Sequence, residues 1–559
     1  MKNIIFGSGC AGRNLATKML DKGDRIDCFV DNARNKWGTS LVGIPIKSPE
    51  ILKNWHEQEI HVLVAVAEAI YYEEISAELE ALGMVEGKHF SNAIGIYNPV
   101  NQLSGFLELP EGFELIKGID EAFRLIINNE EKRIFRAVFP EFCEHYRLVY
   151  DICVQHNLFG NYIVDTKVVE NCWNLPSSDL LLEHAYIEPI SYSIEWSPEI
   201  FEDYVIFMIN FIKELDLAGL ALIDGHSLNV TFHNGKFILL DFGSIRLGKT
   251  GRTAMMRFVN MHINTLLLMK KNKISKAYLF LKNINTPCTL SDIKAYLDSN
   301  ELSVYEELIV KFLEPNVNME LNIFCDRLLD YCKSINCSVQ TSRWEGYQNN
   351  YWDNDGKYTE KQNHVIEFVK RAKPQTMIDL AGNMGWYPIA LSEHVKYAIA
   401  ADFDYNSIDY TYREIKKSNG SISNVIPIYL NIIAPTLDYH AFDHPIISKT
   451  GIIPWRKNAI ERFRCELAMA TAVVHHLVFS QSLTFQEIIS QLKLFTERYL
   501  IVEFVDSTDK AATNIFVDKG FEWYTKEAFC KALEKEFVIL DCKPSTPNES
   551  RILFLCEVK

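Results

Sequence analysis

The stretch MIDLAGNMGW, residues 377–386, constrains the fold of this chain more than any other feature. An apolar run ends in Asp379, and Gly382 and Gly385 then flank Asn383 before a helical pattern begins. A glycine turn between a strand and a helix lets backbone amides approach a nucleotide-type ligand closely. The pattern therefore predicts an α/β domain with a binding site at this turn.

Two further stretches have a similar character: IIFGSGCAGR near the N-terminus, and LIDGHSLNV followed by LLDFGSI in the middle of the chain. At 559 residues the chain is too long for a single hydrophobic core. We therefore expect an α/β multidomain protein in three parts, residues 1–97, 98–335 and 336–559.

Composition argues against several classes of protein. The formal net charge is −16 and the basic residues are scattered, so we expect no surface for nucleic acid. No apolar run approaches the roughly 18 residues that a membrane span needs. The 13 cysteines are dispersed and form no CxxC pair, so reduced thiols are expected rather than zinc. These features predict a cytoplasmic protein without a transmembrane segment.

In the first part, Gly7, Gly9 and Gly12 stand at GxGxxG spacing between a predicted strand and a predicted helix. Asp31 closes the next strand, where a carboxylate can accept hydrogen bonds from ribose hydroxyls. With the segments that follow, this part resembles the small Rossmann-like domain of sugar acyltransferases and of capsule or O-antigen enzymes. The resemblance implies a nucleotide or nucleotide-sugar ligand, and a Rossmann-like domain that binds no ligand is the open alternative.

The middle part contains GLALIDGHSLNVTFHNGKFILLDFGSI, which predicts a loop and a two-stranded hairpin around HNGK. Asp224, Asn229 and Asp241 lie near the strand ends. The segment resembles the carboxyl lobe of protein kinases and small-molecule phosphotransferases. The resemblance implies a central α+β kinase-like domain in which Asp224 orients an acceptor hydroxyl, while Asn229 and Asp241 hold Mg²⁺ against ATP.

Two departures leave the activity of the middle part open. No glycine-rich loop precedes it, and the segment before it offers Lys132, Arg133 and Arg136 in place of the usual strand lysine. An active kinase and a pseudokinase that serves as a scaffold or acceptor-binding domain are the two alternatives. Capping and turn roles for Asp224 and Asn229 are the purely structural interpretation.

In the third part, the form D-x-x-x-N-x-G of the opening stretch resembles motif I of class I S-adenosylmethionine-dependent methyltransferases, usually DxGxGxG. The later segment CELAMATAVVHHLVFSQSLTFQEIISQL resembles the fourth strand of that family and a helix with a His-His pair. RYLIVEFVDSTDK resembles its fifth strand, and SRILFLCEV resembles part of its closing antiparallel hairpin. The resemblance implies a Rossmann-like domain with a seven-stranded sheet. The stretch before it is similar to that of large bacterial methyltransferases that include nodulation-protein-like members.

This resemblance implies S-adenosyl-L-methionine as the cofactor. Asp379 would accept from its ammonium group, and Asp402, at the end of the second strand, from its ribose hydroxyls. NAD is the alternative ligand, because it also uses an acidic residue at the end of the second strand. The turn, however, lacks GxGxxG and carries its aspartate before the glycines. The expected cofactor residues are Asp379, Ala381, Gly382, Asn383, Gly385 and Asp402.

Methyl transfer to a hydroxyl is helped by a general base with a pKa near neutrality, for which histidine is the natural choice. His475 and His476 are the candidates, at the end of a predicted strand. Because adjacent strand residues point to opposite faces, we expect one of them to reach the substrate. Glu503 is the expected orienting residue or alternate base.

Aromatic residues crowd the start of the third part. They can cover the cofactor, stack on a sugar ring or pack in the core; they are Trp344, Tyr347, Tyr351 and Trp352. Asn431 stands where an aspartate is expected, and the segment after it is unusual. Adenine contacts or the substrate rim are therefore expected to differ from the family's pattern.

The sequence as a whole predicts a methyltransferase that acts on a glycan or glycan-linked phosphate in bacterial surface polysaccharide biosynthesis. A bifunctional enzyme that phosphorylates and then methylates its acceptor is the first alternative. The second is a methyltransferase tethered to polysaccharide-assembly enzymes by two non-catalytic binding domains. The expected partner is a glycan or small-molecule acceptor.

Overall fold

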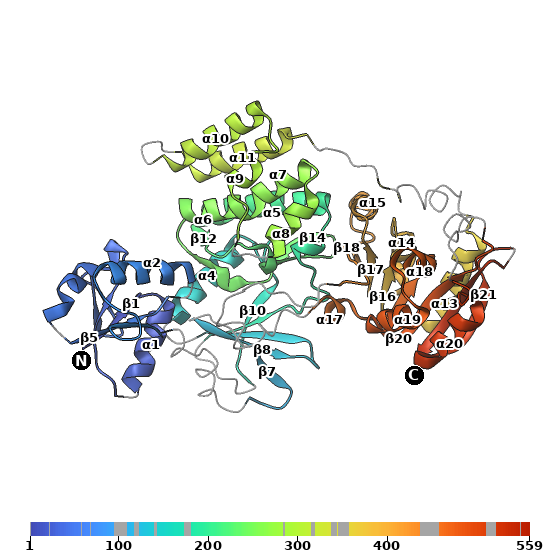
Figure 1. Ribbon diagram of the computed structural model, residues 1–559, viewed down its shortest axis with the longest axis horizontal. Helices are drawn as coiled ribbons and strands as arrows, with labels where there is room; N and C mark the ends of the chain where they lie inside the picture. The colour runs from blue at the N-terminus through green and yellow to red at the C-terminus, as the bar shows by residue number, and fades with distance from the viewer. Residues whose placement is uncertain are drawn as a thin grey trace. The chain divides into compact units, whose positions relative to one another are not determined.

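The computed structural model divides into two compact units (Figure 1). It describes residues 2–21, 23–57, 59–66, 69–93, 109–116, 122–138, 142–172, 180–282, 286–314, 319–336, 342, 344, 357–435, 458–509, 521–547 and 549–559. The first unit contains Met1–Cys143 and Lys167–Glu183, and the second contains Glu144–Thr166, His184–Ala441 and Lys457–Lys559. Residues on both sides of position 335 belong to the second unit, and the division into three domains stays a prediction.

The first unit begins with a six-stranded sheet of order β3-β4-β2-β1-β5-β6. Its elements are β1 (Lys2–Phe6), α1 (Cys10–Asp21), β2 (Ile26–Val30), β3 (Ser40–Leu41), β4 (Ile44–Lys47), β5 (Ile60–Val64), α2 (Ala69–Ala81) and β6 (Phe90–Asn92). Ile4 and Phe6 pack on one face with α2, and Ile5 packs on the other face with α1. The strand, turn, helix and strand predicted for this stretch are confirmed.

A five-stranded sheet follows, in the order β10-β11-β9-β8-β7. The strands are β7 (Phe113–Ile116), β8 (Phe123–Asn128), β9 (Arg133–Val138), β10 (Thr166–Val169) and β11 (Leu181–His184). Strands β7, β8 and β9 form an antiparallel meander. Helix α4 (Cys143–Gln155) stands between β9 and β10 in the chain, and β11 rather than β10 lies beside β9 in the sheet.

The central segment of the second unit combines short strands with helices. The strands are β12 (Leu220–Leu222), β13 (Val230–His233), β14 (Lys236–Leu239) and β15 (Ile245–Leu247), and the helices include α5 (Pro198–Leu217), α6 (Arg252–Phe258), α7 (Asn264–Lys270), α8 (Ile274–Lys282), α9 (Leu290–Ile293), α10 (Ser299–Leu313) and α11 (Leu321–Ser334). Asn234 and Gly235 have φ of 48° and 76°, values that a tight two-residue hairpin requires. The predicted hairpin around HNGK is confirmed as β13 and β14.

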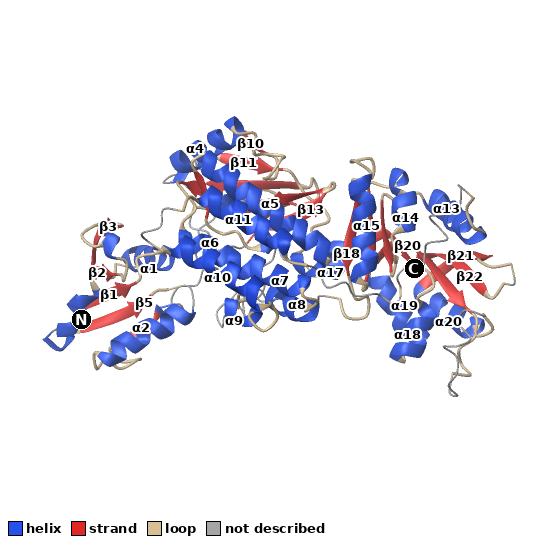
Figure 2. Cartoon of the chain, turned by 90° about the horizontal axis from the view of Figure 1, so that it is seen from above, coloured by secondary structure: helices blue, strands red, loops and turns tan. Residues whose placement is uncertain are grey.

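The chain ends in a seven-stranded sheet of order β18-β17-β16-β19-β20-β22-β21 (Figure 2). Its strands are β16 (Thr376–Leu380), β17 (Tyr397–Asp402), β18 (Val425–Tyr429), β19 (Cys465–Ala470), β20 (Thr496–Val505), β21 (Phe537–Pro544) and β22 (Arg551–Val558). The first five are parallel, and β22 runs antiparallel to both of its neighbours. The predicted seven-stranded sheet with a closing antiparallel hairpin is therefore confirmed.

Helices cover both faces of this sheet, each against its own apolar cluster. One face carries α13 (Glu360–Ala372), α14 (Trp386–Ala390) and α15 (Tyr405–Lys417), and the other carries α17 (Ala459–Phe463), α18 (Val474–Gln481), α19 (Phe485–Leu494) and α20 (Lys526–Glu536). In the described part of the chain, no helix combines the length and apolarity that crossing a bilayer requires.

The strand order fixes where a ligand can bind. From β16 the chain moves to β17 and β18 on one side, and it later returns to β19 on the other side. In open α/β sheets, ligands bind outside the carboxyl ends of the strands at such a reversal. The turn after β16 and the segment after β19 border this point.

Candidate functional site

The turn after β16 is a strained segment in which glycine is required. Ala381, Asn383 and Gly385 have positive φ of 62°, 49° and 71°. A Cβ on Gly382 would lie 2.8 Å from a carboxylate oxygen of Asp379, and a Cβ on Gly385 would lie 2.6 Å from the Thr411 side chain. The turn therefore keeps backbone close to the Asp379 carboxylate.

Asp379 is a buried carboxylate with no internal partner. It is 1% exposed, and neither of its oxygens has a hydrogen-bond partner among the described residues. Burial raises its pKa well above the usual value; the Asp402 charge adds to the rise and the Lys361 charge opposes it. A group in this state needs a proton or a cationic ligand, because burying an unpaired charge is costly.

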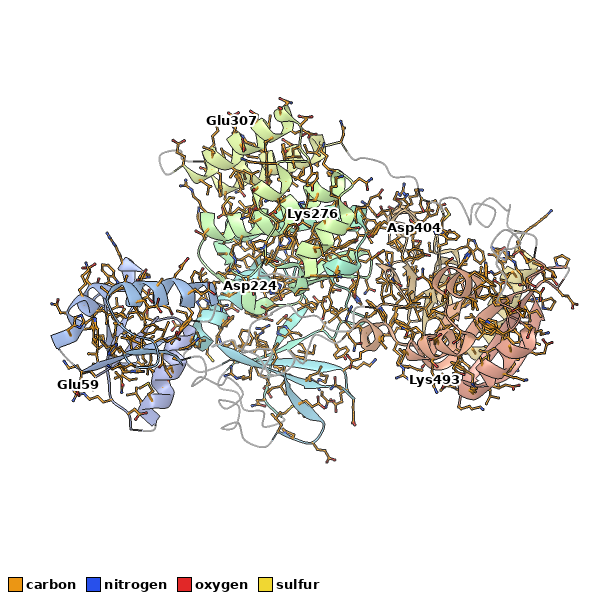
Figure 3. The ribbon with its side chains drawn as sticks, viewed as in Figure 1. Glu59, Asp224, Lys276, Glu307, Asp404 and Lys493 are labelled. Atoms are coloured by element: carbon orange, nitrogen blue, oxygen red, sulfur yellow. The ribbon has the colours of Figure 1, made fainter. Side chains whose placement is uncertain are left out.

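Asp402, the last residue of β17, joins the strand end to the turn. Its carboxylate accepts hydrogen bonds from the Asn383 amide at 2.8 Å and the Asp404 amide at 2.9 Å. Burial raises its pKa to about 6, against the pull of these bonds. Asp404, labelled in Figure 3, caps helix α15 through the Asn406 amide. A carboxylate has about four acceptor sites, so two amide bonds leave capacity for hydroxyl donors.

Trp344 lies beside this turn. Its carbonyl accepts from Asn383 Nδ2 at 3.3 Å, and its ring meets the His476 ring edge-on, 4.9 Å between centroids. Asn383 Nδ2 also donates to Ser407 Oγ at 3.0 Å. Trp344 thus touches both the turn and a candidate base, whereas the predicted roles of Tyr347, Tyr351 and Trp352 lie outside the described residues.

The predicted placement of the two histidines is wrong. Strand β19 ends at Ala470, Ala472 turns the chain with φ of 55°, and His475 and His476 fall in the first turn of α18. Their ring centroids are 4.0 Å apart, so they are neighbours rather than residues on opposite faces. Positions i and i+1 of a helix differ by about 100°, which allows this contact.

The two histidines differ in environment. His475 is buried, and burial together with the nearby His476 and Arg551 charges lowers its pKa to about 3. His476 is only partly buried. A histidine with so low a pKa is a weak base at neutral pH, which favours His476 for proton transfer.

Glu503 is bonded to a lysine and a serine. It is fully buried, its Oε2 pairs with Lys361 Nζ at 2.8 Å, and Ser545 Oγ donates to its Oε1. Burial alone would raise its pKa, but the Lys361 charge, the hydrogen bonds from Lys361 and Ser545 and the Arg551 charge together hold the pKa below its usual value. The role of Glu503 as an orienting residue or alternate base stays a prediction.

Lys361 is a residue of the site that the sequence analysis missed. It is 8% exposed in the first turn of α13, and its charge acts on the pKa of Asp379. The signal was present: Lys361, Val365 and Phe368 follow i, i+4, i+7 spacing on the buried face of an amphipathic helix. A lysine within an apolar stripe is rare unless it is paired.

The middle part brings its predicted residues to one loop and one hairpin. Asn229 Nδ2 donates to the Asp224 carbonyl at 3.2 Å, and the Asp241 carboxylate accepts from the Gly243 amide at 3.0 Å. Asp224, labelled in Figure 3, lies 3.4 Å from His226 Nε2 at the wall of a pocket that also includes Arg257. The metal and catalytic roles of these residues stay predictions.

The three basic residues offered in place of the usual strand lysine of a kinase differ in their contacts. Arg136 in β9 is 1% exposed and lies 3.7 Å from the centroid of the Phe123 ring. Arg133 pairs with Glu183 at 2.8 Å, and Lys132 occupies a turn with φ of 54°. Arg136 is therefore the buried cation of this sheet among the three.

At the N-terminal turn, Gly7 has a positive φ of 104°. A Cβ on Gly12 would lie 1.9 Å from the Gly7 carbonyl oxygen, whereas a Cβ on Gly9 would meet nothing within 4 Å. Asp31 accepts from the Ser8 amide at 2.9 Å and from Lys36 Nζ at 3.0 Å. Burial would raise its pKa, but hydrogen bonds, led by the Ser8 hydroxyl, hold it at about 2. This carboxylate is ionised and already bonded within the domain.

Comparison with known proteins gives distant relatives. No protein-family model matches the chain. The nodulation protein NoeA of Rhizobium meliloti (strain 1021) is 23% identical over 404 residues, covering 67% of this chain and 82% of that protein. The predicted similarity to nodulation-protein-like sequences is confirmed by this match.

Solved methyltransferases match parts of the chain. The N-methyltransferase NodS from Bradyrhizobium japonicum WM9 is 10% identical with a TM-score of 0.26, covering 38% of this chain and 98% of that one. The magnesium protoporphyrin IX methyltransferase ChlM from Synechocystis PCC 6803, with bound SAH, is 12% identical with a TM-score of 0.26. The match covers 48% of this chain and 99% of that one.

Proposed function

We propose that the protein is an S-adenosylmethionine-dependent methyltransferase that methylates a glycan or glycan-linked phosphate in bacterial surface polysaccharide biosynthesis. The observation that carries the proposal is Asp379 in β16, a buried carboxylate whose oxygens have no hydrogen-bond partner among the described residues. A cationic amine would provide the missing partner, and charge-assisted bonds of this kind are strong. The residues therefore fit the cofactor.

Three residues would hold the cofactor. Asp379 would accept from its ammonium group, and Asp402 from its ribose hydroxyls. Gly382 keeps the turn close to Asp379, because a larger residue would meet that carboxylate. The cofactor supplies a methyl group on a sulfonium, which a nucleophile can take in a single displacement.

The acceptor would lose its proton to His476. This histidine is partly buried, stands at the start of α18 beside the reversal point of the sheet, and touches Trp344. An aromatic ring beside a base suits a sugar acceptor, which packs its apolar face on such rings. The glycan class also rests on the resemblance of the first part to sugar-enzyme domains.

The test is transfer of a labelled methyl group to isolated polysaccharide intermediates. We expect His476→Ala to lower kcat by about 10²- to 10⁴-fold, the usual contribution of a general base, with cofactor affinity unchanged. His394→Ala, at an exposed position in the same domain, is the matched control. Transfer by the wild type to small amines or alcohols but to no glycan would contradict the acceptor class.

A second candidate function is phosphoryl transfer by the middle part, giving a bifunctional enzyme. The bond from Asn229 to the Asp224 carbonyl and the Asp241 bond to Gly243 favour it, because they order three residues that such a reaction uses. ATP and Mg²⁺ binding that Asp241→Asn removes would support it. Absence of ATP binding, with partner enzymes retained by the full chain, would favour the tethered methyltransferase instead.

A further inference from the structure

Three tyrosine rings stack where the central segment of the second unit meets the seven-stranded sheet. Tyr278 comes from α8, Tyr405 begins α15, and Tyr429 ends β18. The ring centroids lie 4.4 Å apart for Tyr405 and Tyr429, 5.6 Å for Tyr278 and Tyr429, and 5.7 Å for Tyr278 and Tyr405. The interplanar angles are 25°, 7° and 26°, so each ring limits the positions that the other two can take.

The ring of Tyr278 is also fixed from within the central segment. Tyr278 is 7% exposed, and its hydroxyl donates to the Trp196 carbonyl. Burial raises the pKa of Tyr278 well above its usual value, so the phenol keeps its proton and remains a donor. Trp196 is fully buried, and its Nε1 donates to Ser191 Oγ at 2.9 Å. Tyr278 thus connects a well-packed part of the central segment to two elements of the sheet domain.

The stack borders the end of the proposed cofactor site where Asp402 lies. Asp402 in β17 pairs in register with Tyr429 in β18, so the two side chains share a face of the sheet. Tyr405 follows Asp402 by three residues, and the Asp402 carboxylate accepts from the intervening Asp404 amide at 2.9 Å. A shift of Tyr405 or Tyr429 would therefore shift the backbone that holds Asp402.

We propose that Tyr278 is a positioning residue for the nucleoside end of the cofactor site, which gives the central segment a role in methyl transfer. This role rests on the proposed function, because it assumes that Asp402 binds the ribose of S-adenosylmethionine. Tyr278 holds Tyr405 at the start of α15 and Tyr429 at the end of β18, and these two elements frame Asp402. The sheet domain then depends on α8 for a complete cofactor site, with or without phosphoryl transfer by the central segment.

The competing explanation is that the stack serves only the cohesion of the second unit. Tyr412 allows a matched comparison, because it joins the same helix to the same segment about two turns after Tyr405. It is 4% exposed, its hydroxyl donates to Asp203 Oδ2 at 2.6 Å, and its ring lies 5.6 Å from that of Phe232. Tyr412→Ala therefore removes a similar ring contact and hydrogen bond, away from the end of α15 that follows Asp402.

The experiment is calorimetric titration of the full chain with S-adenosylmethionine. We expect Tyr278→Ala to weaken binding by about 5- to 100-fold, the equivalent of two ring contacts, and Tyr278→Phe, which keeps the stack, to stay within about threefold of the wild type. Tyr412→Ala should stay within about twofold, although thermal unfolding should show that both alanine variants lose stability. If Tyr278→Ala does not fold, Tyr278→Leu, which fills much of the same space without an aromatic ring, is measured in its place.

Double variants separate positioning from a general loss of stability. In the Asp402→Asn background, Tyr278→Ala should weaken binding by no more than about twofold, because the contact that Tyr278 positions is already lost. In the Asp379→Asn background the full loss should remain, since Asp379 would bind the opposite end of the cofactor.

Unchanged affinity in Tyr278→Ala, equal losses in the two backgrounds, or an equal loss in Tyr412→Ala would overturn the role of Tyr278 and leave the proposed function intact. Failure of the wild-type protein to bind S-adenosylmethionine would overturn both. A loss that depends on the Asp402 carboxylate is the result that we expect.

Discussion

At the scale of single residues, buried carboxylates define the proposed cofactor site as much as glycines do. Asp379 and Asp402 were predictable because each follows an apolar strand pattern and precedes a turn or helix signal. Lys361 was not identified, because its importance depends on burial in the first turn of a helix. The distinction between His475 and His476 also depends on the burial of each side chain, which the sequence of two adjacent histidines does not show.

The pKa of Asp402 gives the first prediction. Burial raises it to about 6, so this carboxyl is mostly protonated at pH 5 and ionised at pH 7. Hydroxyl donors bind the ionised form better, so affinity for S-adenosylmethionine should rise with pH, by up to about tenfold per unit below pH 6. Calorimetry between pH 5 and 7 measures this rise, and Asp402→Asn should flatten the profile. A wild-type affinity that falls over this range would contradict the assignment.

The same shift has the opposite sign for the stability of the ligand-free protein. The folded state keeps the Asp402 proton up to about pH 6, whereas an unfolded chain releases it near its usual pKa of about 4. The folded state therefore binds more protons in that window, and its stability falls as pH rises from about 4 to 6. Thermal unfolding without and with ligand should show opposite trends there.

At the scale of elements, the turn between β16 and α14 depends on its backbone conformation. Gly385 has φ of 71°, and a Cβ there would lie 2.6 Å from Thr411. We expect Gly385→Ala to lower the free energy of unfolding by about 2 to 4 kcal/mol, from strain and overpacking together, and to abolish cofactor binding. Denaturant unfolding and titration measure the two effects.

Gly420 provides the matched control. Its φ is 93°, but a Cβ would meet nothing within 4 Å. Gly420→Ala should therefore cost about 1 kcal/mol, from strain alone, with cofactor binding intact. Equal costs at the two positions would show that the contact with Thr411 is unimportant.

Element types were predicted well where an apolar strand pattern is clear, as in β2, which ends just before Asp31, and in the strands that carry Asp379 and Asp402. A helix was expected after the fourth strand, but His475 and His476 were placed at the end of the strand instead of in the first turn of α18. Strand β19 ends at Ala470, and the sequence alone does not reveal that Ala472, two residues later, adopts a left-handed conformation. A single residue in the left-handed region of φ and ψ changes the direction of the chain, and alanine is an unusual residue in that conformation.

At the scale of the whole molecule, a buried ion pair joins distant parts of the second unit. Arg462 Nη1 donates to Glu195 Oε2 at 2.8 Å and to the Ile190 carbonyl at 2.7 Å, across a separation of 267 residues for the pair. Their side chains are 5% and 2% exposed. No local pattern in the sequence identifies such a partner, because contacts at this separation are set by tertiary packing.

Arg462→Met should destabilise the protein by about 3 to 5 kcal/mol, because it leaves Glu195 buried without its cation. Adding Glu195→Gln to Arg462→Met should recover much of that loss, since a neutral amide costs less to bury than an unpaired carboxylate. Denaturant unfolding of the two single variants and the double variant gives the coupling energy. Additive effects would mean that the pair does not interact in solution.

The central claim is that Asp379 binds a cationic cofactor, and calorimetric titration of the full chain with S-adenosylmethionine tests it most directly. We predict binding by the wild type and by Asp24→Asn, which removes an equal charge from an exposed loop. Asp379→Asn should weaken binding by about 10- to 100-fold, the loss of one charge-assisted bond. Unchanged affinity in Asp379→Asn would contradict the account.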